Sequence, residues 1–296
     1  MMSRPQTHRI GNARITRVSE LLLHDFKTTE LIPDWKPGLN DRFEEWMVPD
    51  CLDEAHTHVV ISTHAWLVRT PFHTMLVDTG VGNDKKRPIP VFDGLHEPFL
   101  ERLAELGVSP ESVDYVLHTH LHSDHVGWNT RLVDGRWTPT FPNARTILPQ
   151  LELDRLTELV AKEGADSPKT AVYFDSVLPV LEAGRVTPIG PDGGPVLDGF
   201  VFHPTPGHCS GHVSIGFSSG QDYGVFSGDV VHHPIQIARP KWSSVFSEDH
   251  EQGCASRLWA LNHAADTEAL VFTPHFSNSS AGRVSHSAGG FAWTFA

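Results

Sequence analysis

The run His-Thr-His-Leu-His-Ser-Asp-His at residues 118–125 constrains the fold of this chain more than any other feature. It follows directly on the apolar stretch 113–117, which is typical of a short buried strand. Four imidazoles and a carboxylate this close together are costly to bury without partners, because each unpaired polar group loses several kcal/mol. A metal ion would satisfy them, since imidazole is the commonest metal ligand in proteins. The run therefore predicts a strand that ends in a metal-binding loop.

Composition supports a metal and argues against several other partners. The chain has 20 histidines in 296 residues, and 36 Asp and Glu against 23 Lys and Arg give a net charge of −13. A negative field repels phosphate backbones, so we expect no nucleic-acid partner. No apolar stretch approaches the ~18 residues of a membrane-spanning helix, and no apolar signal region follows the N-terminus. The three cysteines are widely spaced and odd in number, so they predict no disulfide framework. Cys209 is expected to be a small buried thiol. We therefore expect a cytoplasmic protein without a membrane partner.

Hydrophobic patterning predicts strands that alternate with helices. The predicted strands are 13–23, 58–70, 73–80, 113–117, 144–148, 186–190, 199–208, 212–219, 222–230 and 269–276, and the predicted helices are 99–106, 150–161, 170–183 and 248–264. In the last helix, Leu258 and Trp259 are expected to face inward. No Ser/Gly/Pro linker interrupts this pattern, so residues 1–296 are expected to form one domain of sheets covered by helices. A segment rich in proline and aromatic residues, at about 27–57, is expected as an insertion.

Three further polar side chains follow apolar strands in the second half of the chain. They are His208, Asp229 and His275, and each stands beside Gly or Pro. If these strand ends converge with the first, one ion would take His120, His122 and His208. A second would take Asp124, His125 and His275, with Asp229 bridging. Nitrogen and oxygen ligands suit two Zn²⁺ ions, but also Mn, Fe or Co.

These motifs together resemble those of the metallo-β-lactamase superfamily. The likeness rests on T-H-L-H-S-D-H at 119–125, T-P-G-H at 205–208, G-D at 228–229 and the late histidine. It implies an α+β fold, a four-layer αβ/βα sandwich of two mixed β-sheets flanked by helices, with a dinuclear centre at the sheet edge. Asp78 matches a strand-end aspartate that orients a ligand in this family.

Two longer stretches resemble one branch of that superfamily, the N-acyl-homoserine lactonases and methyl parathion hydrolases. These are H-V-G-W-N at 125–129 and G-D-V-V-H-H-P-I-Q at 228–236. The lactonases carry a tyrosine three residues after the bridging aspartate, where this chain has His232. The histidine either replaces that tyrosine in assisting the substrate carbonyl or takes no part.

The predicted function is therefore that of a dinuclear metal-dependent hydrolase. A metal-bridging hydroxide would attack a small, mostly apolar ester or lactone, with a phosphotriester as a side substrate, because zinc lowers the pKa of bound water to about 7. Asp124 is the predicted proton acceptor and His232 the second candidate catalytic residue. Two alternatives stay open: a catalytically silent metal-binding sensor or ligand-binding protein on the same fold, and a thioesterase of the glyoxalase II type. No G-x-S-x-G motif indicates a serine hydrolase.

Several other side chains have a structural interpretation beside the functional one. His118 and His212 are expected to brace the ligand loops. His233 is expected either to line the pocket or to form structural hydrogen bonds. A group of aromatic residues is expected either to rim a substrate pocket or to pack the core, namely Trp46, Trp128, Trp242, Phe246 and Phe276. Part of segment 27–57 is expected to cover the metal edge, either alone or across a homodimer.

Overall fold

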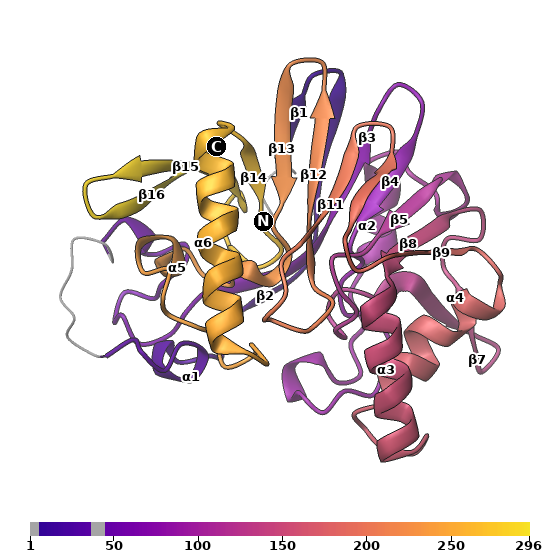
Figure 1. Ribbon diagram of the computed structural model, residues 1–296. Helices are drawn as coiled ribbons and strands as arrows, with labels where there is room; N and C mark the ends of the chain where they lie inside the picture. The colour runs from indigo at the N-terminus through magenta and orange to yellow at the C-terminus, as the bar shows by residue number, and fades with distance from the viewer. Residues whose placement is uncertain (1–5, 37–44) are drawn as a thin grey trace. The chain divides into compact units, whose positions relative to one another are not determined.

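The computed structural model describes residues 6–36 and 45–296, which fall into two compact units (Figure 1). The first unit comprises residues 1–21 and 63–191, and the second comprises residues 22–62 and 192–296. Pro37 and Phe43 of the predicted insertion lie outside the described residues.

The sheet of the first unit has seven strands in the order β1-β2-β3-β4-β5-β8-β9. They are β1 (Thr7–Ile10), β2 (Ala13–Leu23), β3 (Ile61–Arg69), β4 (Thr74–Val77), β5 (Tyr115–Leu117), β8 (Arg145–Pro149) and β9 (Val186–Ile189). The sheet is mixed: β1–β2 and β3–β4 are antiparallel, whereas β4, β5, β8 and β9 pair in parallel. Parallel neighbours end at the same edge, so the loops that leave β4 and β5 lie next to each other.

Helices pack against this sheet. They are α2 (Phe99–Glu105), α3 (Gln150–Glu163) and α4 (Leu178–Glu182), with short 3-10 turns at η2 (Pro90–Phe92), η3 (Pro110–Ser112) and η4 (Gly127–Asn129). Phe99 of α2 is fully buried and stacks on Trp128 at 5.2 Å between ring centroids, so this tryptophan belongs to the core. The predicted helix 170–183 is confirmed as a helical run over residues 171–182, which contains a π-helical turn that the sequence did not predict. A π-helical turn, η5 (Tyr173–Val177), precedes α4 because Pro179 stands in the first turn of α4 and cannot donate a backbone hydrogen bond.

The second unit holds a sheet in the order β10-β11-β12-β13-β14-β15-β16. Its strands are β10 (Gly194–Leu197), β11 (Phe200–Pro204), β12 (Val213–Ser219), β13 (Asp222–Phe226), β14 (Leu270–Phe272), β15 (Ala281–Ser287) and β16 (Gly290–Phe295). Only the pair β13–β14 is parallel. Because β11 and β13 both lie antiparallel to β12, strands β11, β13 and β14 run in one direction and end at one edge.

Helix α6 (His250–Asp266) lies along this sheet (Figure 1) and begins where the Asp249 carboxylate accepts a hydrogen bond from Gln252 N at 2.9 Å. Shorter helical turns are α1 (Thr28–Leu31), η1 (Glu45–Met47), η6 (Gly228–Val230) and α5 (Ile235–Ala238). The expectation that Trp259 faces inward is wrong. Its side chain is 40% exposed because α6 turns it to the helix flank, while Leu261 and Ala264 face the sheet. No helix among residues 6–36 and 45–296 is both long and apolar enough to cross a membrane.

The described parts of segment 27–57 pack within the second unit. Trp35 is buried against His233 and Trp242, at 5.2 and 6.2 Å between ring centroids. Phe276 is also buried in the core, whereas Trp46 is 39% exposed and packs on Phe295 at 6.1 Å. Of the five aromatic residues proposed for a pocket rim or the core, Trp128 and Phe276 are buried, Trp242 and Phe246 are half-buried, and Trp46 is exposed.

Candidate metal centre

The first unit places Asp78 and the histidine loop at adjacent strand ends. Asp78 follows β4 with a left-handed φ of 54°, and its carboxylate accepts hydrogen bonds from Thr119 N at 2.9 Å and Thr119 Oγ1 at 2.8 Å. The same carboxylate lies 2.9 Å from His125 Nδ1. Burial opposes its charge, but attraction to His125 and to His118, whose Nδ1 lies 3.5 Å from Asp78 Oδ1, outweighs burial and lowers the pKa of Asp78 well below its usual range. Asp78 is therefore a carboxylate that fixes both neighbouring loops.

This hydrogen bonding determines which imidazole nitrogens remain for a metal. Since the Asp78 carboxylate can only accept, His125 donates through Nδ1, which leaves the lone pair on Nε2. Thr119 donates its hydroxyl proton to Asp78, so it accepts from His120 Nδ1 at 3.0 Å, and His120 likewise presents Nε2. Both rings are thus oriented as metal ligands usually are.

The four candidate ligands of the first unit lie together. The ring of His120 is 4.6 Å from that of His122 and 4.0 Å from that of His125, measured between centroids. Asp124 Oδ2 lies 3.8 Å from His125 Nε2, and 17% of the Asp124 side chain is exposed. Asp124 and His122 are therefore partly exposed, whereas His120 and His125 are buried.

In the second unit, three imidazole rings contact the Asp229 carboxylate. Its Oδ2 lies 3.2 Å from His208 Nε2 and 3.4 Å from His232 Nε2, and its Oδ1 lies 3.2 Å from His275 Nε2. Ligand atoms around a tetrahedral zinc with bonds of 2.0–2.1 Å stand about 3.3 Å apart. Nitrogen and carboxylate oxygen at this spacing, all buried, fit a divalent metal of the zinc group. His232 lies within this group, so the structure places it among the possible ligands.

Backbone and side-chain contacts hold this second group in place. The carbonyl oxygen of Ser62 accepts from His275 Nδ1 at 2.9 Å, which turns His275 Nε2 toward Asp229. Asp229 N donates to His212 Nε2 at 2.7 Å, so His212 braces the aspartate as expected. His233 Nε2 lies 2.7 Å from the carbonyl oxygen of Cys51, and burial lowers the pKa of His233 to about 4. It is a structural residue that ties the 45–57 segment to the loop after η6.

Sequence reasoning missed three residues that support these loops. Glu20 of β2 is buried and accepts hydrogen bonds from Val81 N, Gly82 N, Trp128 Nε1 and Thr63 Oγ1. Asn129 Oδ1 lies 3.0 Å from His118 Nε2 and accepts from Thr79 Oγ1 at 3.1 Å. Ser62 acts through its backbone, which no sequence pattern reveals. A lone carboxylate in the apolar strand 13–23 was the available signal for Glu20.

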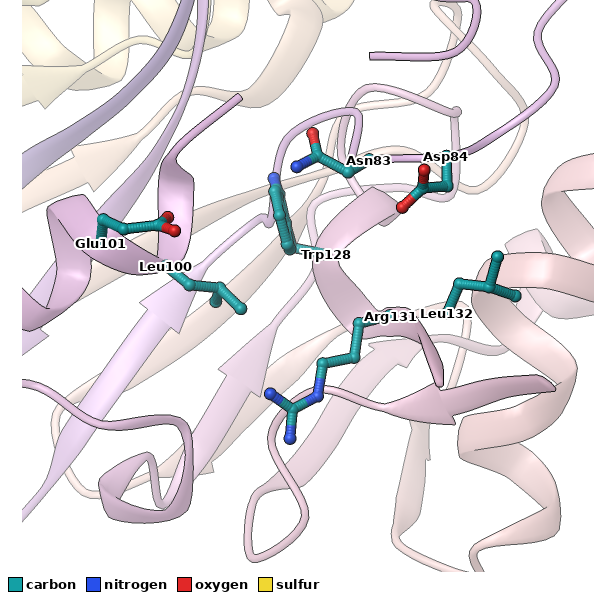
Figure 2. Close-up of a pocket in the computed structure, with 7 residues that line it drawn as sticks. All are labelled: Asn83, Asp84, Leu100, Glu101, Trp128, Arg131 and Leu132. Carbon is teal, nitrogen blue, oxygen red and sulfur yellow. The ribbon is translucent and has the colours of Figure 1, made fainter. Parts of the chain in front are cut away.

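A surface pocket of about 200 Å³ opens beside the histidine loop within the first unit. Figure 2 shows Trp128 between Leu100 and Glu101 on one side and Asn83 and Asp84 on the other, with Arg131 and Leu132 completing the lining. None of the four candidate ligands of the first unit lines this pocket.

The sequence matches the profile of the metallo-β-lactamase superfamily over residues 58–275. The chain belongs to the metallo-β-lactamase superfamily. Among curated relatives of this superfamily chain is a "Probable metallo-hydrolase" of Mycobacterium bovis, 22% identical over 237 residues that span 73% of this chain and 75% of the relative. A hydroxyacylglutathione hydrolase of a Synechococcus species is 30% identical over 135 residues, which span 46% of this chain and 40% of that protein.

Solved structures show the same fold for this superfamily member. The hydrolase AbOPH of the β-lactamase superfamily superposes with a TM-score of 0.82 at 23% identity, over 100% of this chain and 98% of that one. The dizinc quorum-quenching lactonase AidC, in complex with an N-acyl-homoserine product, superposes with a TM-score of 0.75 at 22% identity, over 99% and 97%. The predicted fold class of two mixed sheets with flanking helices is confirmed. With the His/Asp groups, it makes the chain a metal-dependent hydrolase.

Proposed function

We propose that this metallohydrolase cleaves a small, mostly apolar ester or lactone, with the two ligand groups acting on a common pair of divalent ions. His120, His122 and His208 would hold one ion, and Asp124, His125 and His275 the other, with Asp229 shared between them. The observation that carries the proposal is the Asp229 group, in which imidazole nitrogens stand 3.2 Å from each carboxylate oxygen. The relationship to lactone-cleaving structures of the same fold supports the substrate class.

Two divalent ions, when bound, supply an activated water at neutral pH and polarise a substrate carbonyl. The residues of this chain then have separable tasks. Asp124 is partly exposed and would accept a proton from the attacking water and pass it to solvent. Asp78 and Ser62 would keep His125 and His275 in one orientation, so that the ligand set does not reorganise during the reaction.

His232 would contact the substrate carbonyl oxygen. Burial lowers the pKa of His232, so the ring is neutral near pH 7 and can donate a hydrogen bond without carrying charge. Its backbone N–H donates to Gln236 Oε1 at 2.6 Å, and its ring stacks on His275 at 5.7 Å and an angle of 8°. A ring held in this way would keep one orientation and could orient the carbonyl group of a substrate.

A thioesterase of the glyoxalase II type is the second candidate, and the relationship to the Synechococcus hydroxyacylglutathione hydrolase favours it. A glutathione thioester carries two carboxylates that need basic partners, and the net charge of −13 makes such a substrate electrostatically unfavourable. Ester or lactone cleavage therefore stays the leading proposal.

The test combines metal analysis with a substrate panel. Purified protein should carry two divalent ions per chain and hydrolyse acyl-homoserine lactones or aryl esters faster than a neutral phosphotriester or S-lactoylglutathione. Asp124→Ala should abolish turnover and lower the metal content, whereas Asp198→Ala, an exposed carboxylate in the turn before β11, should change neither. Metal binding without turnover on the whole panel would instead indicate the ligand-binding alternative. Full lactone turnover in His232→Phe would remove that histidine from the mechanism.

A further inference from the structure

A second group of potential metal ligands lies elsewhere in the second unit, where α6 covers the sheet. The phenol oxygen of Tyr223, on β13, stands 2.9 Å from Nε2 of His263, on α6. It also stands 3.3 Å from Nε2 of His203, on β11. The two imidazole rings are 5.3 Å apart between centroids. None of these three residues belongs to the seven candidate ligands of the hydrolytic centre.

The two distances from the phenol oxygen to the imidazole nitrogens match the spacing of ligands around one ion. Ligand atoms around a tetrahedral metal with bonds of 2.0–2.1 Å stand about 3.3 Å apart. Both oxygen–nitrogen distances, 2.9 and 3.3 Å, lie close to that value. The elements that carry the three residues are fixed by the sheet and by α6, so little rearrangement would be needed to bind.

The space between the three side chains depends on a glycine. Gly216 of β12 lies between β11 and β13, and a Cβ atom there would come within 2.3 Å of Tyr223 Oη and 2.9 Å of His203 Nε2. The position therefore excludes any larger residue while the phenol and the imidazole converge. Only a residue without a side chain at position 216 lets the phenol and the imidazole meet at this point.

An ion can reach this group from solvent. Trp259, which is 40% exposed, stacks on His263 at 5.0 Å and an angle of 8°, and it lies 5.3 Å from the ring of His203. His203, Tyr223 and His263 are each half-buried. Burial lowers the pKa of both histidines, so their rings are neutral at pH 7 and carry the lone pairs that a metal requires. Burial also raises the pKa of Tyr223, so a metal ion would have to displace the phenol proton for this oxygen to bind as a phenolate.

We propose that His203, His263 and Tyr223 form a second metal site, separate from the hydrolytic centre, for a divalent ion of the zinc, nickel and copper group. Two imidazole nitrogens and an oxygen are ligands that these ions prefer over Mg²⁺ and Ca²⁺. Water would complete the coordination. The indole of Trp259, stacked on one ligand, would report occupancy.

Ni²⁺ titration of the protein with its resident metal retained tests this site. Ni²⁺ should quench the emission of Trp259, measured as the difference between wild type and Trp259→Phe, with a saturation point of one ion per chain. Removing a residue that only hydrogen-bonds to a metal ligand weakens metal binding roughly 10-fold or more. Removing a ligand itself should have at least that effect, so His203→Gln and His263→Gln should each raise the Ni²⁺ concentration at half-saturation by at least ~10-fold. His286→Gln is the matched control, because this histidine of β15 bonds to Asp266 at the end of α6 and contacts Phe291 of β16, and it is not one of the three proposed ligands.

Two readouts separate a metal site from a purely structural hydrogen-bond group. Hydrolytic activity without added Ni²⁺ should be the same in wild type and His203→Gln, since His203 touches no residue of the hydrolytic centre. An anomalous difference map of Ni²⁺-soaked crystals should place an ion within bonding distance of both Nε2 atoms, which keeps the test valid if a variant fails to fold. Equal quenching in wild type and both Gln variants, or a map without an ion between these residues, would overturn the proposal.

Discussion

Glu20→Ala is the substitution that tests most directly how the ligand loops are supported. The Glu20 carboxylate accepts four hydrogen bonds: Oε2 from Val81 N at 2.7 Å and Thr63 Oγ1 at 3.2 Å, and Oε1 from Gly82 N at 2.9 Å and Trp128 Nε1 at 2.7 Å. Two of these donors belong to the loop after β4 and one to the loop after β5. Removing the carboxylate would therefore leave both loops without their common anchor.

The expected magnitude follows from the donors left behind. Three buried N–H groups would lose their acceptor, and each unsatisfied group costs roughly 1–3 kcal/mol. The vacated volume is polar and can admit water, which recovers part of this loss. We therefore expect the free energy of unfolding to fall by about 3–6 kcal/mol near neutral pH.

Urea unfolding at a fixed concentration of added zinc measures this effect as a change in the transition midpoint. Glu101→Ala is the control, because this carboxylate on α2 is exposed and should shift stability by no more than about 0.5 kcal/mol. A loss below ~1 kcal/mol in Glu20→Ala, with both loops ordered, would refute the view that Glu20 anchors them.

The pH dependence of the same variant gives a second test. Desolvation by burial raises the pKa of Glu20 in spite of the hydrogen bonds from Val81, Gly82, Trp128 and Thr63. The folded state thus binds more protons at this site than the unfolded state, and the stability contributed by Glu20 decreases as pH rises above its unfolded pKa. We expect the advantage of wild type over Glu20→Ala to be larger at acidic than at alkaline pH. The opposite trend would contradict this account of the buried carboxylate.

Three further outcomes follow from close contacts and buried charges. Gly127→Ala should destabilise by ~3 kcal/mol or more in thermal unfolding, because its Cβ would lie 1.8 Å from the carbonyl oxygen of Val81; Gly190→Ala, with open space around it, should be near neutral. Burial lowers the pKa of Lys85 to about 7, so the unfolded chain binds more protons above that pH. The free energy of unfolding of wild type relative to Lys85→Met should therefore rise by about 1 kcal/mol per pH unit from pH 7 to 9, and a flat profile would contradict burial as the cause. Asp78→Asn should weaken zinc affinity ~10–100-fold in chelator competition, since a neutral amide has one acceptor oxygen where the carboxylate uses two to accept from Thr119 and His125 Nδ1, and unchanged affinity would exclude that orienting role.

Many secondary-structure elements could be predicted because their patterns are local. Apolar residues in the strand 13–23 and the spacing of Phe99 and Leu103 depend only on the period of a strand or helix, and the structure has β2 at Ala13–Leu23 and α2 at Phe99–Glu105. Four strands were not predicted, because apolar and polar residues alternate too weakly in them. They are β6 (Thr130–Val133), β7 (Arg136–Pro139), β15 and β16. The outward direction of Trp259 also escaped prediction, because an aromatic residue on a helix flank has the same local pattern as one in the core.

What the sequence alone determined was the chemistry of the ligands and the strand ends that carry them, because residue types and short motifs are local properties. Only the tertiary structure decided which nitrogen His120, His125 and His275 present, since that depends on Asp78, Thr119 and the carbonyl oxygen of Ser62. It also brought Glu20 to loops that lie 61 or more residues away along the chain. Long-range hydrogen bonds of this kind leave no periodic trace in a single sequence, so the support of the site becomes visible only when the strands are paired.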